Sequence, residues 1–240
     1  MGMPKDIKII DCMLGIPDAE DRAEWFAPFR PLIKDAQTLQ QFAMPAQYMN
    51  ETSYRAKELY GDRFFFDLPC DPNKGMEEVR RIKRIHAEVG LSALSVFPSG
   101  TLPQVAINHK YMFPLYACAV ELDIPILLNV GIPGPRIPME TQKVEHLDEV
   151  CWFFPDLKIV MRHGAEPWEA LAVKLMLKWP NLYYSTSAFA PKHYPKAIID
   201  YANTRGADKV IKRCTAVQAL SHPKIATPEI RGEYDDQCHH

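Results

Sequence analysis

Short apolar runs alternate with amphipathic segments along the chain from about residue 61 onward. The runs combine β-branched, aromatic and other apolar residues over a few positions, as is typical of strands. They are Arg63–Leu68, Leu91–Phe97, Pro125–Gly131, Leu157–His163, Leu182–Ser187 and Lys209–Ile211. The segments between them carry apolar residues at the three- and four-residue spacing of a helix. They are Met76–Val89, Tyr111–Leu122, Gln142–Phe153, Trp168–Lys178 and Tyr194–Thr204. Each predicted helix leads back to a strand, so the pattern predicts a repeated βα unit.

Prolines mark three of the returns from helix to strand. Pro125, Pro155 and Pro180 each stop a helical segment, and they are 30 and 25 residues apart, which is the length of one βα unit. Strands such as Ile126–Leu128 are apolar at every position, as expected of a parallel sheet covered by helices. Strict alternation in one domain leaves a doubly wound open sheet or a (β/α)8 barrel. No glycine-rich phosphate fingerprint follows the first predicted strand, Ile7–Leu14, so we favour an α/β fold of the (β/α)8 TIM-like barrel type.

The expected barrel is incomplete. Between Ile7–Leu14 and Arg63–Leu68 the chain shows a Pro-, Phe- and Met-containing stretch, Trp25–Tyr48, and a helix-like segment, Glu51–Tyr60, but no clear strand. The count is therefore seven strands instead of eight. The last strand is short, and the chain becomes polar and non-periodic from Lys212 to His240. We expect a barrel domain over residues 1–211 and a separate tail over residues 212–240.

Composition narrows the function classes. The 240 residues are 47% hydrophobic and 24% charged, with a net charge of −2, so a globular domain is expected and no electrostatic attraction to nucleic acid or an acidic membrane. No apolar run approaches the roughly 20 residues of a membrane helix, and the N-terminus lacks a secretory signal pattern. Six cysteines without a C-x-x-C pair favour buried, reduced thiols. The expected setting is cytoplasmic and the expected partner a small-molecule substrate.

Active sites of βα barrels collect at the carboxyl ends of the strands. His163 directly follows one apolar strand and precedes a glycine, so it is a candidate general base or metal ligand. Asp11 at the end of the first strand would add a carboxylate, and Asn129 a neutral oxygen. Ser185 is a candidate hydrogen-bond donor at the end of a later strand, and no G-x-S-x-G nucleophile motif accompanies it.

Two arginines follow strand ends in the same way. Arg136 lies on a glycine- and proline-rich loop, and Arg162 precedes His163. Either guanidinium is suited to hold a substrate carboxylate by two parallel hydrogen bonds. A zinc or manganese site needs three or four converging ligands, whereas the strand ends supply one histidine. We therefore expect no certain cofactor and no high-affinity divalent metal.

The ordered motifs of residues 61–211 resemble the amidohydrolase-2 family of metal-dependent barrel hydrolases and decarboxylases, which includes aminocarboxymuconate semialdehyde decarboxylase. The motifs that carry the resemblance run from the opening Ile9-Ile10-Asp11 to the last predicted strand. They are Phe97-Pro98, Pro114-Leu115-Tyr116, Glu121–Ile126, Phe154–Gly164, Lys178–Ser185, Tyr201-Ala202 and Gly206–Ile211. The resemblance implies a (β/α)8 barrel, a hydrolase or decarboxylase activity, and His163 as a metal ligand.

Departures from the family pattern are concentrated at its metal ligands. Met13 and Gly15 replace the histidine pair of the first strand, and Asn129 replaces the histidine of the fifth. His163 is retained, whereas the Gly-Ser/Thr-Asp-x-Pro motif of the eighth strand is absent after Ile211. A second βα unit of the family is also missing, with an abrupt passage at Met49-Asn50-Glu51. Unpaired strand edges left by this loss predict reduced stability or association into a homo-oligomer.

Three functions stay open from the sequence. The first is an amidohydrolase-related hydrolase or carboxy-lyase for a small carboxylated or cyclic substrate. In it Asp11 and His163 would be catalytic, with Asn129, Arg136, Arg162 and Ser185 binding the substrate. The second is a non-catalytic barrel that binds a metabolite or a protein partner. The third is a defective gene product without a stable function.

Overall fold

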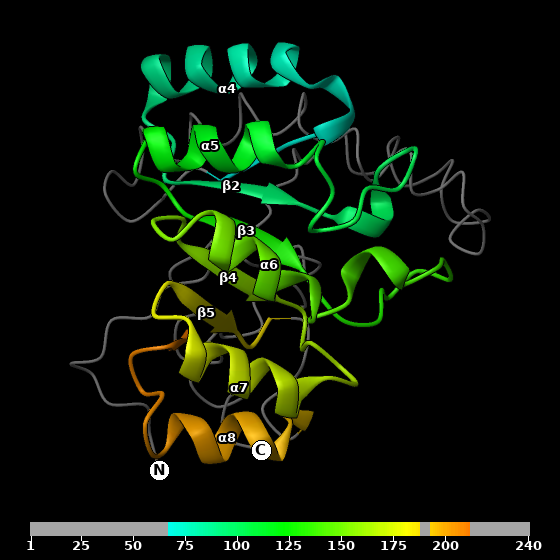
Figure 1. Ribbon diagram of the computed structural model, residues 1–240, viewed down its shortest axis with the longest axis vertical. Coiled ribbons are helices and arrows are strands. Elements are labelled where there is room, and N and C mark those ends of the chain that lie inside the picture. The colour runs from blue at the N-terminus through cyan, green and yellow to red at the C-terminus, as the bar shows by residue number, and fades with distance from the viewer. Residues whose placement is uncertain (1–66, 188–192, 212–240) are drawn as a thin grey trace, which may run out of the picture.

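A computed structural model describes residues 67–187 and 193–211 as a six-stranded parallel sheet with one layer of helices (Figure 1). The strands follow one another in chain order across the sheet. They are β1 (Asp67–Pro69), β2 (Ala93–Val96), β3 (Ile126–Asn129), β4 (Ile159–Arg162), β5 (Leu182–Ser185) and β6 (Val210–Ile211). The α-helices are α4 (Met76–Val89), α5 (Phe113–Glu121), α6 (His146–Phe153), α7 (Glu169–Lys178) and α8 (Lys196–Ala202). Short 3-10 helices are η3 (Pro72–Lys74), η4 (Pro98–Gly100) and η5 (Glu140–Gln142).

The predicted βα alternation is confirmed over the described residues. Five of the six runs contain an observed strand, and the sixth, Arg63–Leu68, overlaps β1 at Asp67 and Leu68. Helix α4 has the bounds that the hydrophobic spacing predicts. The six strands form an open, unclosed wall, as expected of an incomplete barrel. The first predicted strand, Ile7–Leu14, the segment Glu51–Tyr60 and the tail from Lys212 lie outside the described residues.

Helix ends follow from local sequence signals. Gly90 ends α4 in the left-handed conformation, with φ +68°, and its N–H donates to the carbonyl of His86 over 2.8 Å. Glu77 and Glu78 lie in the first turn of the same helix, where carboxylates interact favourably with the helix dipole. In the described ranges, no helix combines the length and apolar character needed to cross a bilayer.

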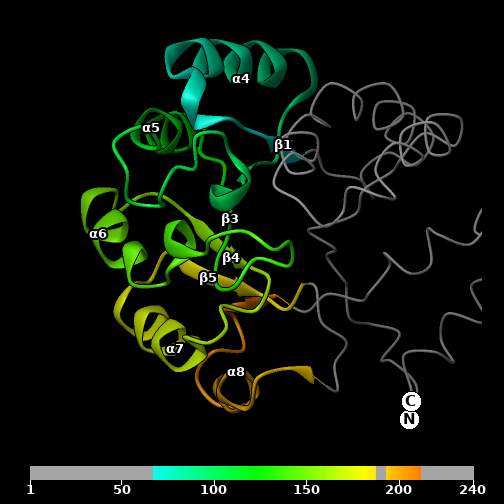
Figure 2. The same ribbon diagram turned by 90° about the vertical axis from the view of Figure 1, so that its right-hand side faces the viewer.

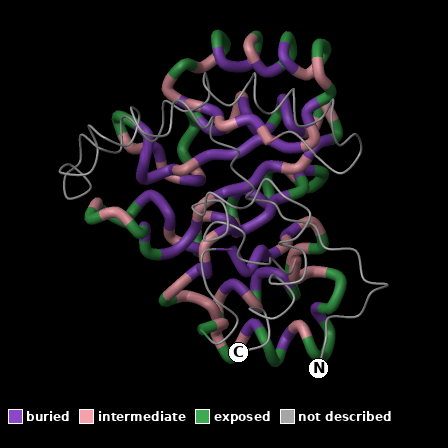
Figure 3. Tube along the Cα trace, turned by 180° about the vertical axis from the view of Figure 1, so that it is seen from behind, coloured by how far each residue is buried: buried purple, intermediate pink, exposed green. Residues whose placement is uncertain are grey.

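The two faces of the sheet have different neighbours because successive side chains of a strand point to opposite sides. One parity, which includes Leu94, Ile126 and Met161, belongs to the large core shared with the helices. Figure 2 shows α5, α6 and α7 together on that side of the sheet. The other parity forms a separate small cluster of Ala93, Leu127 and Val160. We call the face that carries this second cluster the inner face. Figure 3 shows that the strands are largely buried.

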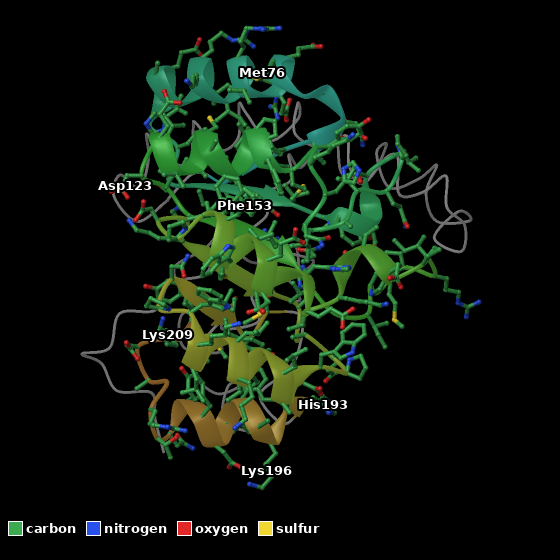
Figure 4. The ribbon with its side chains drawn as sticks, in the orientation of Figure 1. Met76, Asp123, Phe153, His193, Lys196 and Lys209 are labelled. Carbon is green, nitrogen blue, oxygen red and sulfur yellow. The ribbon has the colours of Figure 1, made fainter. Side chains whose placement is uncertain are left out.

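Aromatic rings and one carboxylate join the helices to each other. Phe153, labelled in Figure 4, stacks on Phe113 of α5 with ring centroids 5.7 Å apart. Asp148 of α6 accepts hydrogen bonds from Lys178 Nζ over 2.6 Å and from Trp179 Nε1 over 2.7 Å, at the end of α7. These two donors lower the pKa of Asp148. The helix layer is therefore bonded laterally as well as packed on the sheet.

Gln142 links the loops that follow β2 and β3. Its side chain is 1% exposed. Its Oε1 accepts from the N–H of Ser99 over 3.3 Å, and its Nε2 donates to the carbonyl of Gly131 over 3.0 Å. The backbone carbonyl of Gln142 also accepts from the N–H of Gly131 over 2.9 Å. One buried amide thus holds two strand-end loops in fixed relation.

Gly131 allows the next pair of loops to meet. It has φ +85°, and a Cβ there would lie 2.7 Å from the carbonyl oxygen of Glu166 and 2.8 Å from the carbonyl carbon of Ala165. The adjacent Ile132 N–H donates to the same Glu166 carbonyl over 2.8 Å. Only glycine combines this backbone conformation with so close an approach of the loop after β4.

Gly131→Ala is expected to destabilise the fold by about 2–4 kcal/mol, because it adds both left-handed strain and a backbone collision. Urea unfolding followed by circular dichroism measures the change. The control is Gly134→Ala in the same loop, where a Cβ meets nothing within 4 Å and φ is not positive. Equal stability of the two variants would contradict the proposed collision.

Gln142→Ala is expected to lower the free energy of unfolding by about 2–4 kcal/mol, since it leaves the Ser99 N–H and the Gly131 carbonyl unpaired in a buried place. Gln142→Glu separates the two bonds because it keeps the acceptor and removes the donor. Chemical denaturation of both variants gives the comparison. A loss no larger than that of an exposed glutamine replacement would show that the loops do not depend on this amide.

Candidate active site

Polar residues replace apolar ones at or near the carboxyl ends of the inner-face rows. The inner-face positions of β2, β3, β4 and β5 are apolar or aromatic at Ala93, Leu127, Val160 and Tyr183. Two residues further along, the same rows carry Ser95, Asn129, Arg162 and Ser185. Asp67 of β1 lies on the same face by its pairing with Ala93. The result is a polar cluster over an apolar floor, which we call the inner-face cluster.

Arg162 and Asp67 form an ion pair across the inner face. The distance from Arg162 Nη1 to Asp67 Oδ2 is 3.4 Å, and the side chains are 10% and 27% exposed. These residues come from β4 and β1, with β2 and β3 between them. Three strand spacings would separate them by roughly 14 Å in a flat sheet, more than the two side chains span together. The contact therefore requires the sheet to curve toward its inner face, as the wall of a barrel does.

Asp67 is in an environment that disfavours its charge. Burial raises the pKa of the Asp67 carboxyl, while the positive charge of Arg162 and the Ser95 hydroxyl act in the opposite direction. Its Oδ1 is buried and has no hydrogen-bond partner among the described residues. Unsatisfied buried oxygens are uncommon in folded proteins and point to a role beyond packing.

His163 is held in an unusual backbone conformation directly after β4. Its φ is +68°, followed by +93° at Gly164 and +60° at Ala165. The His163 N–H donates to Ser187 Oγ over 3.1 Å, and the same hydroxyl lies 3.4 Å from the ring Nδ1. The Tyr184 hydroxyl donates to the carbonyl of Gly164 over 2.8 Å. A left-handed histidine costs about 1–3 kcal/mol, and such strain is found mainly at functional positions.

Of the other site residues that the sequence predicts, the structure brings Ser185 and Asn129 into the inner-face cluster, whereas the roles of Arg136 and Asp11 stay predictions. Ser185 is fully buried on the inner face, and its Oγ has no hydrogen-bond partner among the described residues. Asn129 pairs in register with Arg162, so the two residues are neighbours at the strand ends. Arg136 is exposed on the loop after β3, and its place in the site stays a prediction. Asp11 lies outside the described residues.

From the sequence, Ser187 is a possible hydrogen-bond donor and Asp67 a polar residue at a strand end, but their contacts with His163 and Arg162 are not predicted. Asp67 interrupts the apolar run Phe64–Leu68, and that single charge in a predicted strand is the signal that marks it. Its partner, however, is 95 positions away in the chain. Ser187 follows β5 by two positions and is fully buried. Its contact with His163 joins two separate strand ends and has no local signature.

The donor set at the described strand ends does not fit a divalent metal. Within residues 67–187 and 193–211, no three His, Cys, Asp or Glu side chains lie close enough together to hold an ion. An amide stands at Asn129, and the guanidinium of Arg162 adds positive charge to the same face. The Nδ1 edge of His163 is directed to Ser187.

Solved structures with a similar fold include barrels and decarboxylases. An uncharacterized TIM-barrel protein, Bb4693 from Bordetella bronchiseptica, is 17% identical over 96% of this chain and 94% of its own, with a TM-score of 0.63. A 2,6-dihydroxybenzoate decarboxylase from Rhizobium is 14% identical over 82% and 77%, with a TM-score of 0.53. A 5-carboxyvanillate decarboxylase from Novosphingobium aromaticivorans, solved with manganese, is 16% identical over 76% and 63%, with a TM-score of 0.52. These likenesses establish the TIM-barrel fold.

Curated proteins offer no match to the sequence. A family model described as Amidohydrolase, in contrast, matches residues 36–211, which is most of the chain. The matched range contains all six described strands, the Arg162–Asp67 pair and His163. From this match and the barrel wall that the strands build, the chain belongs to the amidohydrolase family.

Proposed function

We propose that this chain is an amidohydrolase-family enzyme, a hydrolase or carboxy-lyase, that acts on a small carboxylated substrate at the inner-face cluster. The observation that carries the proposal is the buried guanidinium of Arg162 on the inner face, beside the polar ends of the neighbouring strands. A buried arginine at the carboxyl end of a barrel strand is suited to hold a carboxylate.

The other residues of the cluster have distinct roles in this proposal. Arg162 binds the substrate carboxylate, and Asn129, its neighbour in register, orients the bound group. Ser185 adds a buried hydroxyl from β5, which is separated from the strand of Asn129, β3, by β4. His163 transfers the proton from its place directly after β4, where Ser187 holds its N–H and lies near its ring. Asp11 is retained as a second catalytic candidate on the strength of the sequence.

Decarboxylation of an aromatic acid is the first reaction to test. Two of the similar structures are decarboxylases of 2,6-dihydroxybenzoate and of 5-carboxyvanillate. Their shared feature is a carboxylate on a substituted ring, which agrees with a guanidinium at the strand end. These two acids are therefore suitable first substrates, with release of carbon dioxide as the readout.

A non-catalytic barrel is the second candidate. It is favoured by one observation, the described donor set that lacks the ligands for a metal. In this case the inner-face cluster would bind a carboxylated metabolite without turning it over. The two candidates share a binding site and differ only in what His163 does.

Arg162→Gln is expected to weaken binding of a carboxylate probe such as benzoate by about 10- to 100-fold, because a hydrogen bond to a charged group contributes roughly 1.5–3 kcal/mol. Titration calorimetry measures the affinity. The matched control is Arg80→Gln, which removes an exposed arginine of α4 and should leave benzoate binding unchanged. Equal affinities for the wild type and the Arg162 variant would refute the assignment.

His163→Ala is expected to reduce turnover of the aromatic acid by about 10²-fold or more with a small effect on binding, as is typical for loss of a general acid or base. Carbon dioxide release at saturating substrate gives the rate. His193→Ala, at the exposed histidine labelled in Figure 4, is the control for removal of an imidazole. Binding without turnover in the wild type would instead select the non-catalytic barrel.

A further inference from the structure

Asp67 has no part in the proposed reaction, yet it is bonded to the residue that holds the substrate. Its Oδ2 contacts Arg162 Nη1, and its Oδ1 is buried without a partner among the described residues. A substrate carboxylate and the Asp67 carboxylate would compete for the same guanidinium. Substrate binding at Arg162 therefore changes the environment of Asp67.

We propose that Asp67 is the exchangeable counter-ion of Arg162: a substrate carboxylate replaces it on the guanidinium, and Asp67 then takes up a proton from solvent. This inference rests on the proposed function, because it assumes that Arg162 binds a carboxylate. It makes Asp67 a specificity-determining residue, since it ties the binding of an anion to the uptake of one proton.

The geometry of the ion pair is that of a contact that can be exchanged. Charge-assisted N–H···O bonds between arginine and a carboxylate are typically about 2.7–2.9 Å long and often occur in pairs. Arg162 and Asp67 make one contact of 3.4 Å. An incoming carboxylate that forms two shorter bonds would therefore be preferred over the resident one.

The surroundings of Asp67 determine whether it is protonated after a substrate carboxylate has replaced it on the Arg162 guanidinium. Within the described part of the chain, the Arg162 guanidinium on β4 and the Ser95 hydroxyl on β2 act on the pKa of Asp67, and the charge of Asp67 acts in turn on the Cys70 thiol just after β1. Arg162 is the cation of this set. A partly buried carboxylate that loses its cation is disfavoured, and protonation removes the charge. Burial already raises the pKa of Asp67 with Arg162 beside it, so loss of the pair raises that pKa further.

The exchange balances in charge and in protons. One guanidinium–carboxylate pair is broken and another forms, and one solvent proton bonds to an Asp67 oxygen. The complex thus holds one proton more than the free protein when Asp67 is ionised in the free protein. By linkage, benzoate affinity rises up to tenfold for each unit by which the pH is lowered. This holds between the Asp67 pKa of the free protein and the higher pKa of the complex.

Titration calorimetry with benzoate tests the exchange directly. At one pH, binding is measured in phosphate and in Tris, whose different ionisation enthalpies reveal how many protons are taken up. We expect the wild type to take up about one proton per benzoate and Asp67→Asn to take up none, with an affinity that no longer depends on pH. Benzoate binding through Arg162 without proton uptake, or uptake that persists in Asp67→Asn, would overturn the proposal.

A second measurement needs no ligand and separates failure of this inference from failure of the proposed function. In Arg162→Gln, Asp67 has lost its cation and should have a pKa above its unfolded value. Its contribution to stability is then present at low pH and lost as the pH rises through the folded-state pKa. Arg162→Gln/Asp67→Asn should lack this pH dependence. Identical pH–stability curves for the two variants would overturn the inference, whereas a wild type that fails to bind benzoate would reject only the carboxylated substrate.

Discussion

The two-residue period of the parallel strands is the constraint on which the rest of this structure depends. Because helices cover one side of the sheet, every second strand residue must be apolar to join the main core. The alternate residues are released from that requirement. They form a small apolar floor and, at or near the strand ends, the polar cluster that contains Arg162 and Asp67. The fold thereby separates the residues that stabilise it from those that remain available for chemistry.

Curvature links this local rule to the site. Asp67 and Arg162 belong to strands that are not neighbours, and their contact exists only because the wall bends. The loops follow the same bend, since Gly131 brings the turn after β3 onto the turn after β4. His163 lies at the start of that second turn, with its N–H and ring near Ser187. Loop packing and side-chain placement are therefore parts of one arrangement, which the backbone of a few residues controls.

The βα order and the strand-end residues can be predicted from the sequence, whereas contacts between distant segments cannot. Periodicity predicts the βα order and the bounds of α4, because both depend on neighbours no more than about four positions away. The βα order also predicts that Asn129, Arg162, His163 and Ser185 lie near one another, because the carboxyl ends of parallel strands meet at one edge of the sheet. The pairing of Asp67 with Arg162 and the two bonds of Gln142 join distant segments. Such contacts are fixed by tertiary geometry, and no local pattern encodes them.

The three cysteines of the described ranges, Cys70, Cys118 and Cys151, lie in the main core and form no disulfide. Burial raises the pKa of each thiol, that of Cys151 to about 12. The thiolate, which is the reactive form, is therefore a small fraction of each cysteine at neutral pH. Alkylation of these cysteines requires the core to open locally. Cys118 lies on α5 and Cys151 on α6, so the rate of their modification reports the opening of two adjacent helices. The alkylation rates of these thiols therefore measure how often the helix layer separates from the barrel wall.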